Sequence, residues 1–243
     1  MIANKKEKEI HPITLFYIGT IAIITIISKI YEETEFLKLI KINYKKVIRK
    51  YEIWRLITTF FYIGKFSPRF IIKFLLYYRR MKSSETKFKK KKKIAEFIMM
   101  LIYLMIIIHI CNYIGYYYFK IKINSFLSHQ LMFSIILINS KREPTKYFRF
   151  YFFHIENRYV PYFLFSMRTA RNGDKIINHI ISFVPGLAYY WLKDVLPIYG
   201  YNILLTPKFL VDFIEEKIYK KKLKKKNHNT KTKNQNKNDN IIS

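Results

Sequence analysis

Two long stretches without charged side chains constrain this chain more than any other feature. Residues 13–28 carry no charge, and residues 97–119 interrupt their apolar run only at His109 and Asn112. About 20 consecutive apolar residues in a helix span the hydrocarbon core of a bilayer. The alternative is a buried helix of a soluble core, but two such stretches and four weaker ones hold more apolar surface than 243 residues can bury. We therefore expect an all-α protein that crosses a membrane several times.

The charged residues lie between the apolar stretches. Lys and Arg total 45 against 16 Asp and Glu, which gives a formal net charge of +29. A soluble nucleic-acid binder mixes its basic residues through amphipathic elements, and that mixing is absent here, so we expect no nucleic-acid partner. Cys111 is the only cysteine, which excludes a disulfide framework. We expect neither a cofactor nor a bound metal ion.

The apolar pattern predicts six spans. The expected segments are residues 12–30, 67–81, 94–119, 123–139, 159–168 and 175–196. The fifth is too short to cross a bilayer by itself. The first is followed by charged residues and not by a small-residue cleavage site, so we interpret it as a retained span and not as a signal peptide. The loop after it mixes apolar and basic residues, which is typical of helices lying in the membrane interface.

The chain divides into a polar N-terminus (1–11), a membrane domain (12–216) and a Lys/Asn-rich tail (217–243). The tail has too few apolar residues to fold, so we expect it to be disordered. It either attracts anionic lipid or acidic partners, or reflects a compositional bias of the whole chain, which we favour. Basic residues concentrate at both ends and in 79–93 and 141–158, so these segments and both termini are expected in the cytosol. The loop after the first span is also basic, although this topology places it in the lumen.

Five short motifs occur in a fixed order between residues 12 and 215. They are EIWRLIT (52–58), YRRM (78–81), SKREP (140–144), WLKDVLP (191–197) and LTP (205–207). In order and spacing they resemble the Derlin (Der1-like) family of rhomboid-like pseudoproteases. The resemblance implies a six-helix rhomboid-like bundle in the endoplasmic reticulum membrane that assists retrotranslocation of misfolded proteins for proteasomal degradation (ERAD) without catalysis. A plastid-membrane relative acting in protein import is the alternative in the same class.

The resemblance also implies partners: misfolded clients, a ubiquitin ligase complex and a cytosolic AAA ATPase, in a homo- or hetero-oligomer that the sequence leaves open. The tail lacks the short Gly-rich, Arg-containing motif through which many Derlins recruit that ATPase. Trp54 and Arg55 are expected to anchor the first loop, with the indole at headgroup level and the guanidinium on phosphate. Ser182 and Gly186 replace the family's paired glycines and are expected to pack helices closely.

The mechanism that the resemblance implies depends on the lengths of the spans and on a lateral cleft between them, and it needs no nucleophile. The short, charge-flanked second and fifth spans are expected to thin the bilayer locally. Polar groups in a lateral cleft, of which Lys73 and His179 are candidates, are expected to receive a client's hydrophilic face. The alternative from a different class is an active intramembrane serine protease that uses Ser128 and His179. Rhomboid nucleophiles are bracketed by glycines, whereas Leu127 and His129 flank Ser128, and the fourth span has no glycine for an oxyanion site.

Overall fold

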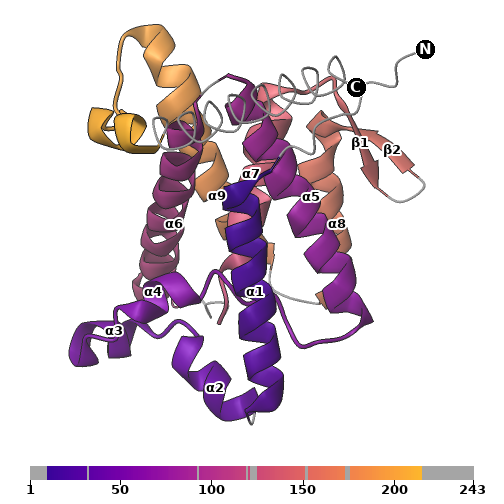
Figure 1. The fold of residues 1–243 in the computed structure, drawn as a ribbon, viewed down its shortest axis with the longest axis vertical. Helices are drawn as coiled ribbons and strands as arrows, with labels where there is room; N and C mark the ends of the chain where they lie inside the picture. The colour runs from indigo at the N-terminus through magenta and orange to yellow at the C-terminus, as the bar shows by residue number, and fades with distance from the viewer. Residues whose placement is uncertain are drawn as a thin grey trace, which may run out of the picture.

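A computed structural model describes residues 10–214 apart from 32, 92, 119, 121–124, 151–152 and 173–175. Six helices of 13 to 24 residues build the bundle in this part of the chain: α1 (Pro12–Ile30), α5 (Pro68–Lys90), α6 (Ile94–Tyr117), α7 (Ser128–Arg142), α8 (Val160–Asn172) and α9 (Ile176–Tyr190) (Figure 1). The mostly helical fold agrees with the all-α expectation. The tail after residue 216 lies outside the described residues.

Shorter elements connect these helices. Between α1 and α5 lie α2 (Glu33–Ile40), α3 (Tyr44–Lys50) and α4 (Trp54–Thr58). A hairpin of β1 (Tyr147–Phe150) and β2 (Phe153–Glu156) and the 3-10 turn η1 (Asn157–Tyr159) link α7 to α8. The π-helical η2 (Trp191–Val195) and the 3-10 turn η3 (Leu196–Tyr199) continue α9. The hairpin is a departure from the expectation, because the sequence indicated only a basic loop there.

Two helices are long and apolar enough to cross a membrane by length and composition: α1, with 19 residues, and α6, with 24. The helices α7 and α8 contain 15 and 13 residues. At a rise of 1.5 Å per residue they are only about 20 Å long, whereas the hydrocarbon core of a typical bilayer is about 30 Å thick. The helix α9 is not short in this sense, because η2 and η3 continue it to Tyr199. The expected fifth span is therefore short, but the second is not, because α5 has 23 residues.

The second helix corrects a predicted boundary. We expected it to end near Met81, but α5 continues to Lys90. The polar side chains on this extension turn into the bundle: Ser84 is 1% exposed and Glu85 is fully buried. Because Ser84 bonds to α7 and Glu85 to α1, the extra turns are stabilised by tertiary contacts that the local sequence does not reveal.

The first turn of α1 is capped from another helix. The side chain of His11, at the N-cap position, does not cap the first turn. Instead, the Glu85 carboxylate accepts from the amides of Ile13 and Thr14 at 3.3 and 2.8 Å and from the Thr14 hydroxyl at 2.7 Å. A helix N-terminus favours negative charge because its first amides lack partners within the helix. Glu85 thus fixes the start of α1 against α5.

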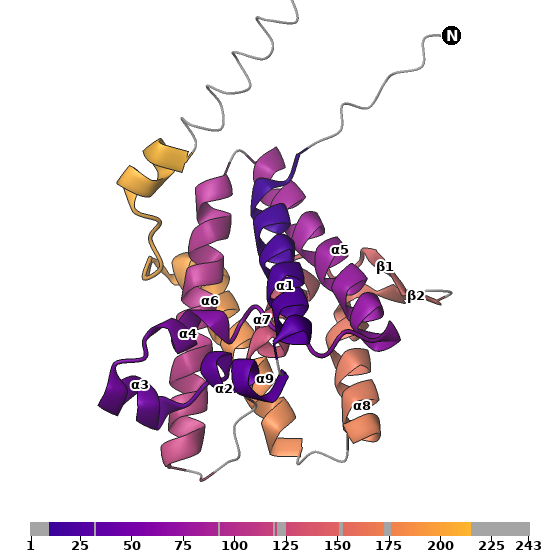
Figure 2. The ribbon, with the colours of Figure 1, turned by 60° about the horizontal axis from the view of Figure 1, so that its bottom comes forward.

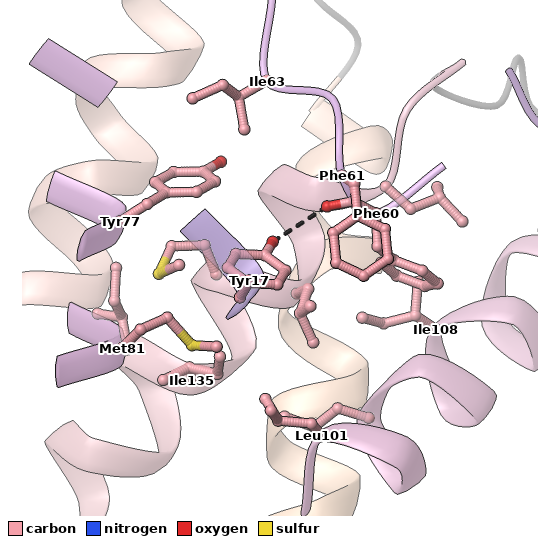
Figure 3. Packing of buried hydrophobic residues seen from close by; sticks show 14 of the residues in the cluster. Tyr17, Phe60, Phe61, Ile63, Tyr77, Met81, Leu101, Ile108 and Ile135 are labelled. Carbon is pink, nitrogen blue, oxygen red and sulfur yellow. Dashed lines mark hydrogen bonds between the residues drawn. The ribbon is translucent and has the colours of Figure 1, made fainter. Parts of the chain in front are cut away.

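The core lies among α1, α5, α6, α7 and the connecting segment 60–63 (Figure 3). Tyr17 of α1 points into it and donates its hydroxyl to the Phe60 carbonyl at 3.0 Å. The Tyr17 ring also contacts Phe61 at 5.4 Å between centroids. This segment lies between α4 and α5, so its burial ties the first loop to the bundle.

The termini of the helices define two ends of the bundle. The start of α1, the junction of α5 and α6, and the hairpin lie at one end, which we call the hairpin end (Figures 1 and 2). The short helices α2, α3 and α4 lie toward the other. Large apolar side chains cover the outward faces of α1 and α6, including Leu15, Phe16, Ile23, Ile102, Ile106 and Ile110. Such a surface suits lipid.

Candidate functional site

Arg55 joins the short helices of the first loop to one another. It lies in α4, and its side chain is 1% exposed. Its Nη1 donates to the carbonyl oxygens of Lys38 and Lys41 at 2.6 and 3.0 Å, and its Nε donates to the Glu52 carboxylate. Because a guanidinium presents several donors in a planar fork, one side chain holds the end of α2 and the start of α4 together. The expected lipid phosphate contact is corrected: Arg55 binds protein oxygens.

Trp54, the other half of the motif, points away from this contact. It is 52% exposed, and Ile53 and Ile57 beside it are each 59% exposed. An exposed indole flanked by aliphatic side chains suits the membrane interface. The structure therefore divides the Trp-Arg pair into an outward apolar residue and an inward polar one.

The helices α7 and α9 pack closely against each other at Gly186. A Cβ added there would lie 3.0 Å from the Ser134 Cα and 3.0 Å from Leu137 Cδ2. Ser182, one turn earlier in α9, is buried. The Phe133 and Phe183 rings, also from these two helices, meet at 4.6 Å. Small residues thus occupy the α9 positions where the α7 backbone leaves least space.

Polar groups gather where α7 begins. The Ser128 hydroxyl is fully buried and donates to the Tyr62 carbonyl at 2.6 Å. The next residue, His129, shares a 2.6 Å hydrogen bond with the Tyr77 hydroxyl of α5. Lys73, also on α5, reaches the Ile63 carbonyl at 3.5 Å. The backbone of His179 lies in α9, but its side chain lies outside what the structure describes.

This polar group lacks the features of a hydrolytic or metal site among the described side chains. The recorded partner of the Ser128 hydroxyl is a carbonyl oxygen, whereas a serine nucleophile donates to a base. Asn112 and Gln130 saturate each other through reciprocal amide hydrogen bonds of 2.5 and 3.2 Å. Within the described ranges, no group of three or more His, Cys, Asp or Glu residues is arranged to hold a metal ion.

Two motifs that are far apart in the sequence meet at the hairpin end. Arg142, in the SKREP motif, donates from Nε and Nη2 to the Asp194 carboxylate of the WLKDVLP motif at 2.9 and 3.0 Å. Its guanidinium also lies over the rings of Phe88 and Tyr189, at 5.6 and 5.8 Å from their centroids. The sequence analysis missed this pairing, although opposite charges in two motifs that flank spans were a usable signal.

Comparison with known proteins identifies the family of this chain. The model of the Der1-like family matches residues 10–208. This chain belongs to the Der1-like family. It is 28% identical over 178 residues to a probable derlin-2 homolog of Dictyostelium discoideum, covering 72% of this chain and 68% of the relative. It is 30% identical over 176 residues to Derlin-2.1 of Zea mays, covering 70% of each. The resemblance seen in the sequence is confirmed.

A second ionic group lies beside the Arg142–Asp194 pair of this Derlin. Glu143 forms salt bridges with Lys87 of α5 at 2.5 Å and with Lys146 at 2.9 Å. Lys87 also donates to Asn139, whose amide donates to Ser84 at 2.7 Å. These contacts join the end of α5 to the end of α7. The two ionic groups thus link the end of α7 to η2 and to α5.

Acid should weaken the link between α7 and α5. Partial burial alone would raise the pKa of Glu143, but hydrogen bonds and charge from Lys87 and Lys146 outweigh it, and the pKa is lowered. A carboxyl whose folded pKa is depressed stabilises the fold fully above its unfolded pKa and loses that contribution as pH falls through the folded value. We expect Glu143→Gln to remove at most about 1 kcal/mol near neutrality, because the pair is partly solvated.

The measurement is the free energy of unfolding in mild detergent as a function of pH. The difference between wild type and Glu143→Gln should shrink as pH falls below the ordinary Glu pKa. Glu35→Gln is the matched control, because Glu35 forms an exposed ion pair with Lys38. A constant difference between wild type and Glu143→Gln at every pH would contradict the prediction.

Proposed function

We propose that this Derlin is a non-catalytic protein of the endoplasmic reticulum membrane that assists retrotranslocation of misfolded proteins for proteasomal degradation. The observation that carries the proposal is the family match over residues 10–208, which covers the whole helical bundle through α9. The partners follow from the family: misfolded clients, a ubiquitin ligase complex and a cytosolic AAA ATPase. The protein works with them as a homo- or hetero-oligomer.

The proposed mechanism is local thinning of the bilayer. A protein whose hydrophobic helices are shorter than the hydrocarbon core draws the two leaflets together. The helices α7 and α8, of 15 and 13 residues, supply that mismatch. We expect Lys73 and His179 to supply polar groups to a lateral cleft that receives the polar groups of a client. Nanodisc-embedded protein imaged by electron cryomicroscopy should show thinner lipid beside α8, and uniform thickness around the protein would sink the mechanism.

The proposed orientation places the hairpin end in the cytosol. Basic residues retain short loops on the cytosolic side during insertion. The α5–α6 junction and the segment after α7 are both rich in Lys and Arg and lie at this end. Protease added to intact, right-side-out microsomes should cut within 82–93, at the exposed lysines near residue 90 because Ser84 and Glu85 are buried. It should also cut after residue 217 and spare 31–55. The reverse pattern would invert the orientation.

Loss of the protein should lengthen the half-life of a misfolded membrane client. The test is a cycloheximide chase in cells depleted of the protein and in cells given it back. Affinity purification in mild detergent should recover a ubiquitin ligase and the AAA ATPase. Recovery of the protein-import machinery of a plastid instead would indicate that the protein acts in protein import at the plastid membrane.

Replacing Ser128 should leave client turnover unchanged. Ser128→Ala removes one buried hydrogen bond to the Tyr62 carbonyl, which costs about 1 kcal/mol of stability, but it removes no chemistry. We expect the variant to restore client degradation to the wild-type rate in depleted cells at matched expression. A serine-directed activity probe should not label the wild-type protein. Labelling that Ser128→Ala abolishes would instead establish an intramembrane protease.

A further inference from the structure

The chain beyond η3 forms an arm that returns along the outside of the bundle. Gly200, at a φ of 90°, ends η3 and redirects the chain. Residues 201–207 form neither helix nor strand, and residues 208–214 are helical. Figures 1 and 2 both place this yellow C-terminal segment beside the hairpin end of α6. We call residues 200–214 the C-terminal arm.

Two hydrogen bonds and one apolar contact fix the arm to the bundle. Lys193 donates to the Leu204 carbonyl at 2.8 Å, and the Tyr103 hydroxyl donates to the Leu205 carbonyl at 3.1 Å. The Leu204 side chain packs against the core. Tyr103 lies about 13 Å along α6 from its first residue. The middle of the arm is therefore held against the side of a membrane-spanning helix.

The outward side of the arm is apolar. Five large side chains along it are 60–74% exposed: Tyr201, Ile203, Leu205, Phe209 and Phe213. Phe209 and Phe213 are four residues apart in the helical part, so they share one face. This surface continues the exposed aliphatic face of α6 that Ile102 and Ile106 provide on either side of Tyr103. We therefore expect this surface to contact lipid, as the exposed face of α6 does.

The charged residues near the arm indicate which region of the bilayer it contacts. Within the arm, Asp212 offsets the charge of Lys208, but the sequence after the arm adds seven lysines between 217 and 226 against Glu215 and Glu216. Aromatic residues beside lysines favour the boundary between headgroups and acyl chains, and clustered lysines favour anionic lipid. We propose that the C-terminal arm lies in the leaflet at the hairpin end and binds anionic lipid there. This contact is independent of client handling.

Site-directed spin labelling of the full-length protein in nanodiscs tests the proposal. In a Cys111→Ser background, single cysteines at 209 and 213 receive a nitroxide, and collision rates with oxygen and a water-soluble nickel complex report depth. Ile106→Cys on α6 is the lipid reference, and Thr145→Cys before β1 is the water reference. We expect the oxygen-to-nickel ratio at 209 and 213 to exceed that at 145 several-fold. It should rise further when phosphatidylserine is added to phosphatidylcholine.

Three outcomes would overturn the proposal. Ratios at 209 and 213 equal to that at 145 mean that the arm lies in water. Low collision rates with both reagents mean that protein covers the arm, either a second copy or another partner. An oxygen-to-nickel ratio that does not change when phosphatidylserine is added means that the arm does not bind anionic lipid. Circular dichroism of each labelled variant establishes that its helical content matches that of the unlabelled protein.

Discussion

Arg55→Ala should destabilise the protein by about 3–5 kcal/mol, the range for removing one partner of a buried ionic contact. The substitution leaves the Lys38 and Lys41 carbonyls without their donor and the Glu52 carboxylate without its counter-charge. Arg55→Lys should recover only part of the loss, because an ammonium cannot present the same planar fork. The measurement is unfolding in detergent micelles followed by circular dichroism, together with hydrogen exchange in α2 and α4.

Trp54→Ala is the matched control, since Trp54 is adjacent, in the same helix, and half exposed. It should change the free energy of unfolding in detergent far less than Arg55→Ala does. In cells, Arg55→Ala should slow client degradation more than Trp54→Ala at equal protein level. Equal loss of stability in the two variants would refute the assignment of Arg55 as the residue that holds the first loop together.

Gly186→Ala should destabilise the pair of helices α7 and α9. The new Cβ meets the Ser134 Cα at 3.0 Å, and a backbone atom cannot rotate away as a side-chain tip can. Overpacking of this kind costs about 1–3 kcal/mol, and Gly186→Val should cost more because its two methyl groups need further space. The measurement is the free energy of unfolding in detergent for both variants.

Gly19 offers the control for this substitution. It also lies within a helix, α1, but a Cβ built there has nothing within 4 Å. Gly19→Ala should be neutral or stabilise the protein by up to about 1 kcal/mol, because alanine favours the helix more than glycine does. A loss at Gly19 as large as that at Gly186 would mean that close packing is not the cause.

The sequence predicted best those elements whose signal is local. The bounds of α1 agree with the expected 12–30, and α6 begins where expected, because long charge-free runs specify a membrane helix without help from other segments. The extension of α5 was missed because it depends on distant residues. Ser84 bonds to Asn139, 55 residues away, and Glu85 bonds to Thr14, 71 residues away. The local sequence does not distinguish a polar residue that is buried against a distant partner from one that is exposed to water.

The role of Arg55 was half predicted for a related reason. Its residue type and motif marked it as important, but two of its partners are the backbone carbonyls of Lys38 and Lys41. Every residue has a carbonyl, so the sequence holds no sign of which one is used. Arg142 and Asp194 differ, because both partners are charged side chains within recognised motifs. Pairing opposite charges between motifs at the same expected side of the membrane would have found that contact.

The cap that Glu85 provides for α1 has a consequence for biosynthesis. The first helix leaves the ribosome long before residue 85 is made. The amides of Ile13 and Thr14 therefore lack their acceptor, the Glu85 carboxylate, during that time. Until α5 arrives, the start of α1 depends on water or headgroups for those hydrogen bonds. A nascent chain arrested before Glu85 therefore holds an inserted but unfinished helix. Assembly of the bundle, and not insertion of α1, is the step that completes it.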